Sequence, residues 1–192
     1  MKKIFLLVMV VTMLASGNLL AQVSGGVRLG GNLSNIKYSA GDFSATDDSK
    51  FGPLFGLYLT AMFADKVGLQ PELVYSAMGS KDGDAKLNLG YIALPVLLRY
   101  QIIEQIHLLL GPQAAFLLSA KYKEGDYDED AKDLFKGLDF SAVVGAGADI
   151  DRFNVGLRYG FGLANIIENE GEDFKAKSST FQIVLGYKLF GD

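Results

Sequence analysis

The stretch "FNVGLRYGFGL", residues Phe153–Leu163, places large apolar side chains at every second position. Glycine, asparagine and Arg158 stand between them, so the two faces of the segment differ in both size and polarity. A period of two is typical of a β-strand with one apolar face, and this much glycine argues against a helix. The stretch therefore predicts a strand with one side in an apolar environment.

Seven further segments repeat this alternation along the chain. They are residues 23–36, 51–63, 67–76, 87–100, 106–119, 139–150 and 181–189. The links between segments alternate in length. They are short at 64–66, 101–105 and 151–152, and long and polar at 37–50, 79–86, 120–137 and 165–177. This alternation predicts an all-β fold, an eight-stranded antiparallel up-and-down β-barrel with its long loops at one end and both termini at the other.

Glycine indicates which face looks into the barrel. The glycines on the polar face are Gly26, Gly30, Gly52, Gly56, Gly68, Gly111, Gly145, Gly147, Gly156, Gly160, Gly162 and Gly186. A narrow barrel has room inside for only some full side chains, whereas glycine weakens a strand that faces water. We therefore expect the polar face inside and the apolar face outside, where only hydrocarbon suits it. Because a closed barrel also pairs all its backbone groups in lipid, the sequence predicts a transmembrane barrel.

Aromatic residues in the outward phase support this orientation. They gather toward the short-turn end (Phe63, Tyr100, Phe153, Tyr187) and toward the long-loop end (Phe51, Phe55, Tyr75, Phe116, Phe140, Phe161, Phe181). Two aromatic girdles are typical of membrane barrels. Tyr58 and Tyr91 are expected to point inward instead. The alternative is a lipocalin-like barrel in the periplasm that binds an apolar ligand, and it requires the apolar face inside.

The N-terminus has the order of a secretory signal peptide. Lys2 and Lys3 precede the apolar run 4–15, and small or polar residues lead to a cut expected after Ala21, with a cut near Ser16 as the alternative. The run is shorter than the ~20 residues that a membrane-spanning helix needs. We therefore predict a Sec-dependent signal peptide over residues 1–21 and one barrel domain over residues 22–192. Cysteine is absent, which excludes disulfides and a lipoprotein anchor.

The net charge argues against nucleic acid as a partner. Without Lys2 and Lys3, 16 basic residues stand against 22 acidic ones, a net charge of −6. No basic cluster with interleaved aromatic residues offsets it.

Several stretches resemble a known family in their order and spacing. They are "GVRLGGNLSNI" (26–36), "LQPELVYSAMG" (69–79), "YIALPVLLRY" (91–100), "LLGPQAAFLL" (109–118), "VVGAGADI" (143–150) and "VGLRYGFGLANI" (155–166). Together they resemble the PorT-like outer-membrane β-barrel family of Bacteroidetes. The resemblance implies a barrel of the size of OmpA and OmpX in the Gram-negative outer membrane, with lipid and the barrel assembly machinery as partners. It implies little about activity, and nothing places the chain in the branch that serves gliding and type IX secretion.

Two positions depart from that family. Many members carry glutamate where Ala93 stands, so one lumen carboxylate is missing. The chain also ends on Gly191 and Asp192 rather than on an aromatic residue, which bears on recognition by the assembly machinery.

Seven charged residues fall on the inward face. They are Arg28, Glu72, Arg99, Asp139, Asp149, Arg158 and Lys188. In an interior about as wide as the side chains that fill it, such charges must pair or remain at high energetic cost. We expect a structural polar network that plugs the lumen rather than an ion-selective constriction.

Three motifs only partly match known sites. His107 is the single histidine and has no Ser-His-carboxylate signature around it, so an outer-membrane lipid enzyme stays a third hypothesis. "VVGAGADI" lacks the third glycine of a dinucleotide-binding fingerprint. "EGDYDEDAKD" (124–133) departs from a calcium loop at Ala131 and Gly137, which leaves weak loop metal binding open.

We therefore predict no catalytic residue, no cofactor and no dedicated metal site. The functional prediction is a monomeric, non-enzymatic outer-membrane barrel with a plugged polar lumen. Its role would be structural or in surface interactions through the four long loops, with an unidentified surface or secretion-system partner.

Overall fold

The computed structural model describes residues 23–40, 43–83, 85–125, 127–167 and 174–191. The predicted signal peptide, residues 1–21, lies outside the described residues. The strands are β1 (Val23–Ala40), β2 (Phe43–Thr46), β3 (Asp48–Ala64), β4 (Val67–Asp82), β5 (Ala85–Gln101), β6 (Ile106–Glu124), β7 (Tyr127–Asp130), β8 (Leu138–Ile150), β9 (Phe153–Gly162) and β10 (Phe174–Phe190). A short 3₁₀-helix, η2, covers Lys132–Leu134. None of the helices in this described part is both long and apolar enough to cross a membrane.

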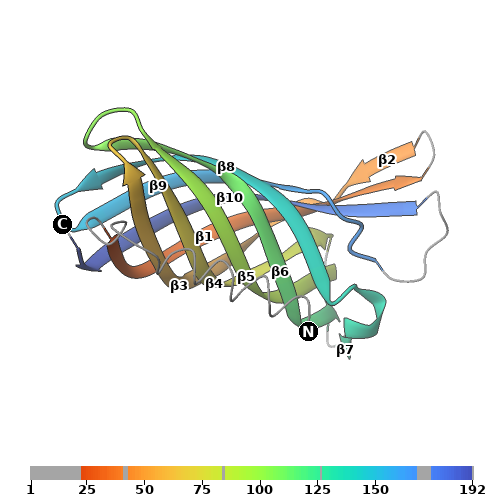
Figure 1. Cartoon of the computed structure of the whole chain (residues 1–192). Coiled ribbons are helices and arrows are strands. Elements are labelled where there is room, and N and C mark those ends of the chain that lie inside the picture. The colour runs from red at the N-terminus through yellow and green to blue at the C-terminus, as the bar shows by residue number, and fades with distance from the viewer. Residues whose placement is uncertain (1–22, 41–42, 84, 126, 168–173, 192) are drawn as a thin grey trace, which may run out of the picture.

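Eight strands form a closed antiparallel ring (Figure 1). In order they are β1, β3, β4, β5, β6, β8, β9 and β10, and β10 pairs with β1 to complete the barrel. Each matches one of the segments predicted from the alternation, with β9 ending at Gly162, one residue before the end of its segment, so the fold prediction is confirmed. The start of β1 meets the end of β10, where Gly25 pairs with Phe190, at the end of the barrel that carries the short turns.

The long links contain more strand than the sequence pattern suggested. The expected loop 79–86 is a paired hairpin, in which β4 and β5 continue to Asp82 opposite Ala85. Gly83, with a φ of +56°, makes the turn between them. Strands β2 and β7 add similar extensions beside β1 and β6. Side chains in these polar stretches still point alternately to the two faces of the sheet. Their backbones pair with each other beyond the long-loop end of the ring.

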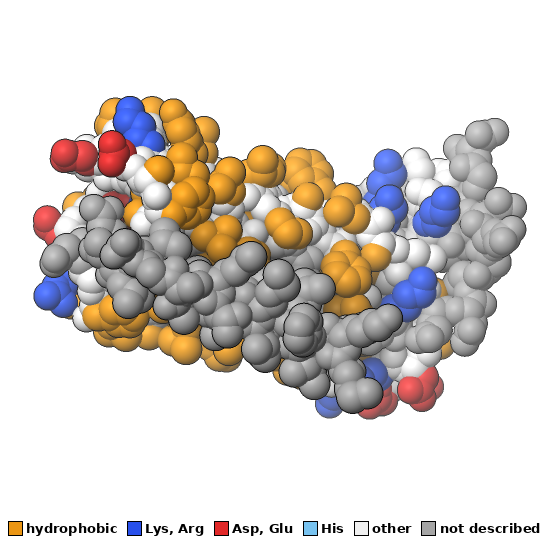
Figure 2. All heavy atoms as spheres, viewed as in Figure 1, with side chains coloured by type: hydrophobic (Ala, Val, Ile, Leu, Met, Phe, Trp, Pro, Cys, Tyr) orange, Lys and Arg blue, Asp and Glu red, His pale blue; other side chains and the backbone are white. Residues whose placement is uncertain are grey.

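The side chains face as the alternation predicts. Leu157 is 51% exposed on the outer face and Leu185 is 47% exposed, whereas Arg28 and Arg158 are buried inside at 1% and 4%. Figure 2 shows apolar side chains spread over the middle of the barrel wall. The lipocalin-like alternative does not fit this orientation, because it needs the apolar face inside.

Outward aromatic rings lie near both ends of this apolar belt. Phe153 packs edge-on against Tyr187 at the short-turn end, with ring centroids 5.3 Å apart. Phe55 lies 5.0 Å from Tyr75 toward the long-loop end. Such paired rings match the interfacial girdles of a membrane barrel.

The interior is polar in only part of its length, which limits the predicted polar lumen to the lower half of the barrel. At the long-loop end a buried apolar cluster fills the barrel. It consists of Ile36, Met78, Leu89, Tyr91, Ala93, Ala115, Leu117, Ala120, Ala131, Phe135, Ile166 and Ala176. Above the belt the outer face carries exposed lysines such as Lys37, Lys86 and Lys177. Since the wall faces water there, the strands bury their apolar side chains inside, as a soluble barrel does.

One inward assignment is wrong for a local reason. The alternation in segment 106–119 puts Ser119 on the polar face and so predicts an inward side chain, but Ser119 is exposed. The pairing of β5 with β6 shifts between Gly90 and Tyr91, so Gly90 pairs with Ser119 and Tyr91 with Leu117. This extra residue in β6 moves Ser119 to the outer face.

Candidate functional site

A buried carboxylate, Glu72 on β4, lies at the centre of a polar layer inside the barrel. Arg158 on β9 donates from its two terminal nitrogens to the two oxygens of Glu72, each at 2.8 Å. Arg28 on β1 also forms an ion pair with Glu72, and Gln70 donates to it at 2.7 Å. The face of the Tyr58 ring lies 4.6 Å from the Arg28 guanidinium. Three strands are thus tied together through one carboxylate.

A second ion pair lies closer to the short turns. Arg99 on β5 pairs with Asp149 on β8, and His107 Nδ1 lies 3.3 Å from Asp149 Oδ2. Asn154 joins the two pairs, because it accepts from Arg28 at 3.3 Å and donates to Asp149 at 2.8 Å. Gln70 joins them again by accepting from Arg99 at 3.2 Å. The layer is one continuous network.

The structure brings together five of the seven charged residues that the sequence placed in the lumen. Asp139 lies apart, where its Oδ2 accepts a hydrogen bond from the Ser178 hydroxyl at 2.9 Å. Lys188 lines an open cavity at the short-turn end. Sequence reasoning missed Gln70 and Asn154 as connectors. Both stand in the inward phase of their strands, and that phase is the signal that identifies them.

Aliphatic side chains separate this network from the long-loop end. Leu97, Leu109 and Val143 form one buried group, and Leu54, Val74 and Val184 form another. Leu97 and Val74 each stand two residues beyond a network member, Arg99 and Glu72, on the same strand. On the other side of the network, a cavity of about 590 Å³ opens at the short turns and reaches Arg99 and Asp149.

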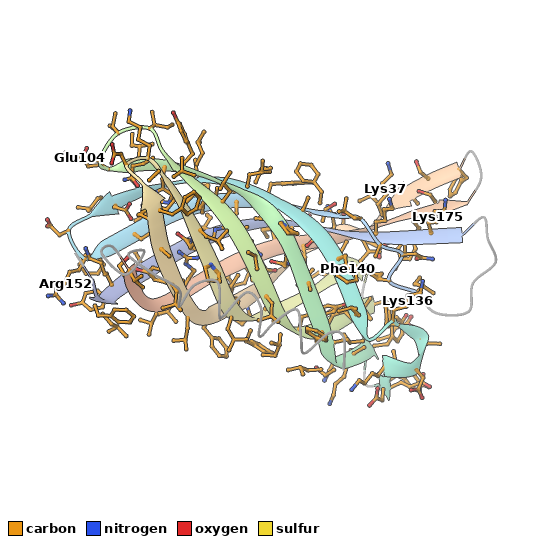
Figure 3. The ribbon with its side chains drawn as sticks, viewed as in Figure 1. Lys37, Glu104, Lys136, Phe140, Arg152 and Lys175 are labelled. Carbon is orange, nitrogen blue, oxygen red and sulfur yellow. The ribbon has the colours of Figure 1, made fainter. Side chains whose placement is uncertain are left out.

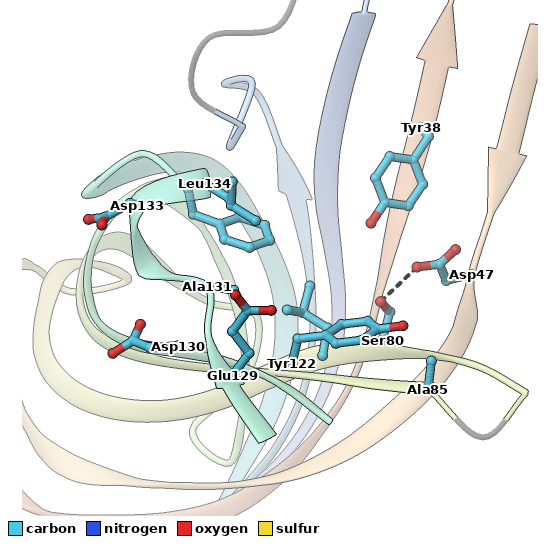
Figure 4. A pocket seen from close by; sticks show the side chains of 12 residues that line it. Tyr38, Asp47, Ser80, Ala85, Tyr122, Glu129, Asp130, Ala131, Asp133 and Leu134 are labelled. Atoms are coloured by element: carbon cyan, nitrogen blue, oxygen red, sulfur yellow. Dashed lines mark hydrogen bonds between the residues drawn. The ribbon is translucent and has the colours of Figure 1, made fainter. Parts of the chain in front are cut away.

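The opposite end of the barrel carries a cavity of about 620 Å³, which we call the mouth pocket. It is lined by Tyr38, Asp47, Ser80, Ala85, Leu87, Tyr122, Glu129, Asp130, Ala131, Asp133, Leu134 and Phe135. Figure 4 shows Tyr38 and Asp47 on one side of the pocket and Glu129 and Leu134 toward the other. The Ser80 hydroxyl donates to Asp47 at 2.7 Å. Carboxylates and phenol groups therefore surround an apolar floor.

The remaining motifs have structural explanations where they are described. Gly147 of "VVGAGADI" leaves space for His107, since a Cβ there would lie 2.6 Å from Nε2 of the imidazole. Within the described part of the chain, no serine or threonine hydroxyl hydrogen-bonds to His107, and no group of three or more His, Asp or Glu is arranged to hold a metal. The acidic stretch 124–133 lies partly outside the described residues.

The family model for the outer membrane protein beta-barrel domain matches residues 17–168. The chain belongs to this outer-membrane β-barrel family. The comparison with curated proteins returned no match.

Two solved structures are similar in fold to this outer-membrane barrel. The attachment invasion locus protein Ail of Yersinia pestis is 16% identical, with a TM-score of 0.53 over 88% of this chain and 99% of Ail. Neisserial surface protein A is 12% identical, with a TM-score of 0.59 over 86% of this chain and 99% of the other. At these identities the likeness concerns the fold alone. The family match and the outward apolar belt place the protein in the outer membrane.

Proposed function

We propose that the protein is a surface-interaction barrel that binds its ligand in the mouth pocket and conducts nothing through the lumen. The observation that carries the proposal is the arrangement along the barrel axis. A cavity of about 620 Å³ opens at the long-loop end, and below it lie buried aliphatic side chains and then the ion network. Its volume is in the range of small-molecule sites.

The polar network then has a structural role. Glu72 is fully buried and is compensated by Arg28 and Arg158, so its charge holds strands together. An ion-selective constriction needs charges that face a continuous water path. In a planar lipid bilayer we expect no stepwise conductance from the wild-type protein. Reproducible unitary currents would contradict the proposal.

The lining of the mouth pocket favours a ligand with a positive charge and an apolar body. Asp47, Glu129 and Asp133 line it together with Tyr38 and Tyr122, whose rings attract cations through their faces. The apolar floor suits a hydrocarbon or aromatic group. Ail was solved in complex with the heparin analogue sucrose octasulfate, which is an anion. Carboxylates here favour the opposite charge.

The test uses benzyltrimethylammonium as the cationic probe and benzyl alcohol as the neutral comparison. Isothermal titration with the purified protein in detergent micelles should detect the cation and not the alcohol. Glu129→Gln with Asp133→Asn should weaken binding about fivefold for each charge, the upper end for exposed ion pairs. Asp65→Asn, at the short-turn end, is the matched control and should change nothing. Equal binding of cation and alcohol would contradict the proposed specificity.

We infer that the protein is not an enzyme. His107 is buried beside Asp149, and the Nε2 side of its ring faces the Gly147 backbone rather than a nucleophile. A His107→Ala variant that lost a measurable turnover of outer-membrane lipid would overturn this inference.

We also infer a finer identity for the chain. The motifs quoted above support membership of the PorT-like family of Bacteroidetes, and the order of residues 1–21 supports a cleaved Sec signal peptide. Insertion by the barrel assembly machinery and a monomeric state complete this proposal. N-terminal sequencing of the protein purified from outer membranes tests the cut after Ala21, and a sedimentation measurement in detergent tests the monomer.

A further inference from the structure

Three lysines cluster on the outer face of β1 and β10, just beyond the apolar belt. Lys37 on β1 pairs directly with Lys177 on β10, and Lys175 lies on the same face two residues further along. All three are exposed, and Figure 3 shows Lys37 and Lys175 at the long-loop end. Like charges directly opposite each other on a sheet are destabilising. An anion between them would remove that repulsion.

The described part of the protein leaves these ammonium groups available. None of the three forms an ion pair or side-chain hydrogen bond there, and β1 and β10 carry no acidic residue between Ser34 and Ala40 or between Lys175 and Thr180. Lys50 offers the contrast. It donates to the Leu87 carbonyl at 3.1 Å and also to Asn88, so its charge is used inside the protein.

A second, independent feature lies directly below the lysines. The lipid-facing wall is hollowed into a groove of about 410 Å³. Its lining includes Gly31, Leu33, Phe51, Phe181, Ile183 and Leu185. The Phe51 ring lies across Gly31, where a Cβ would come within 2.4 Å of it. The groove is almost wholly apolar, and it faces the hydrocarbon.

The same two strands carry groove and lysines in register. Leu33 pairs with Phe181 at the upper end of the apolar belt, Asn35 pairs with Ser179 next, and Lys37 pairs with Lys177 after that. Four residues span about 13 Å along a strand, which is about 10 Å of depth at the tilt of a membrane barrel. Long lysine side chains shorten this distance by reaching toward the headgroups. From the belt toward the long loops, this outer face is therefore first apolar, then able to form hydrogen bonds, and then cationic.

We propose that this face of β1 and β10 binds a phosphorylated, acylated lipid of the outer leaflet. An acyl chain lies in the groove, Asn35 and Ser179 meet the sugar or ester region, and Lys37, Lys175 and Lys177 bind phosphate. A soluble anion would use the lysines but leave the groove unexplained. The site is separate from the mouth pocket, which opens inside the barrel rim, so either proposal stands without the other.

The experiment measures lipid retention by the purified protein. The protein is placed in phosphatidylcholine nanodiscs that contain a minority of diphosphorylated lipid A. The protein is then released from the nanodiscs, and native mass spectrometry counts the lipid A molecules that stay bound to it. We expect retention of one lipid A molecule and none of its dephosphorylated form. The double variant Lys37→Gln/Lys177→Gln should lower the affinity about 30-fold, or about fivefold for each lysine near an anionic surface.

The matched control is Lys81→Gln/Lys86→Gln. These lysines also pair directly with each other, but on β4 and β5, neither of which contributes a residue to the groove. Heat-modifiable migration on a gel verifies that each variant is folded. If the control loses lipid A as strongly as the test variant, general surface charge explains retention and the proposal fails. It also fails if inorganic phosphate at equal concentration displaces lipid A from the wild-type protein.

A further outcome concerns the acidic residues between β9 and β10. Glu168, Glu170, Glu172 and Asp173 lie outside the described residues. If they neutralise the lysines, Lys37→Gln/Lys177→Gln will lower the stability of the barrel and leave lipid A retention unchanged. That result would overturn the lipid site.

Discussion

Within the apolar belt the strands turn leucine outward and arginine inward, whereas beyond the belt the same strands turn lysine outward and leucine inward. On β1, Leu29 is exposed and Arg28 is buried, but a few residues later Lys37 is exposed and Ile36 is buried. On β10 the change falls between Phe181 and Lys177. Continuous strands therefore carry both arrangements.

The difference shows that each half is stabilised by a different force. Apolar side chains gain nothing by moving from lipid into the lumen, so the lower half relies on ion pairs and hydrogen bonds between its inward side chains. The upper half stands in water, where burial of Leu89, Tyr91 and Phe135 is favourable. Four substitutions probe this contrast, from the largest expected effect to the smallest.

Removal of the central carboxylate should break the lower half. Glu72→Ala leaves Arg28 and Arg158 buried without their counter-charge, which costs about 4 kcal/mol of unfolding free energy. Urea unfolding in lipid vesicles measures the loss. A cost below ~1 kcal/mol would mean that water, rather than the ion pairs, solvates this layer.

A charge on the outer wall should distinguish the two halves directly. Leu157→Arg places an arginine in the lipid-facing belt and should cost about 3 kcal/mol. Leu134→Arg is the control, because Leu134 is 63% exposed in η2 beyond the belt. Vesicle refolding of both variants provides the measurement. Equal costs at the two positions would contradict the assignment of the membrane boundary.

Truncation in the upper cluster should loosen only the upper half. Leu89→Ala removes a buried side chain on β5 and should cost about 2 kcal/mol, the low end for such changes, since the hairpin ends can settle around the cavity. Hydrogen exchange should accelerate in β4 and β5 near their shared turn. Acceleration around Glu72 to the same extent would show that the halves unfold as one unit.

Substitution of Asp139, the carboxylate outside the network, should have the smallest effect on the unfolding free energy. Asp139 has Ser178 as its side-chain partner, and asparagine can still accept that hydrogen bond. Asp139→Asn should therefore change the unfolding free energy by less than about 1 kcal/mol. A loss as large as that of Glu72→Ala would show that Asp139 has a role in the network that the described contacts omit.

The alternation of residues predicted the barrel, the strand positions and the outward face, because a period of two is a local property of each strand. It also placed Arg28, Glu72, Arg99, Asp149 and Arg158 inside. It did not predict which of these residues meet, since partners such as Arg28 and Glu72 depend on register between strands that are not neighbours in the ring. For the same reason, the alternation did not predict that Asp139 and Lys188 lie apart from the network.

The reversal of polarity at the long-loop end was missed for a different reason. Polar residues between the segments suggested loops, although the stretch 85–93 keeps a period of two with its apolar side turned inward. Segment 87–100 is apolar on both faces, and this is the sequence signal for the reversal. A bulge such as the one in β6 opposite Gly90 and Tyr91 cannot be predicted from periodicity, because one extra residue changes the phase without a change in composition.

The seam between β1 and β10 joins the first and the last strand of the ring, from Gly25 beside Phe190 to Ala40 beside Phe174. Until the last strand is available, both margins of the curved sheet present unpaired amides and carbonyls, which hydrocarbon does not solvate. The barrel therefore cannot close until β10 has been translated. A nascent polypeptide that reached the bilayer early would need another protein to shield those two margins.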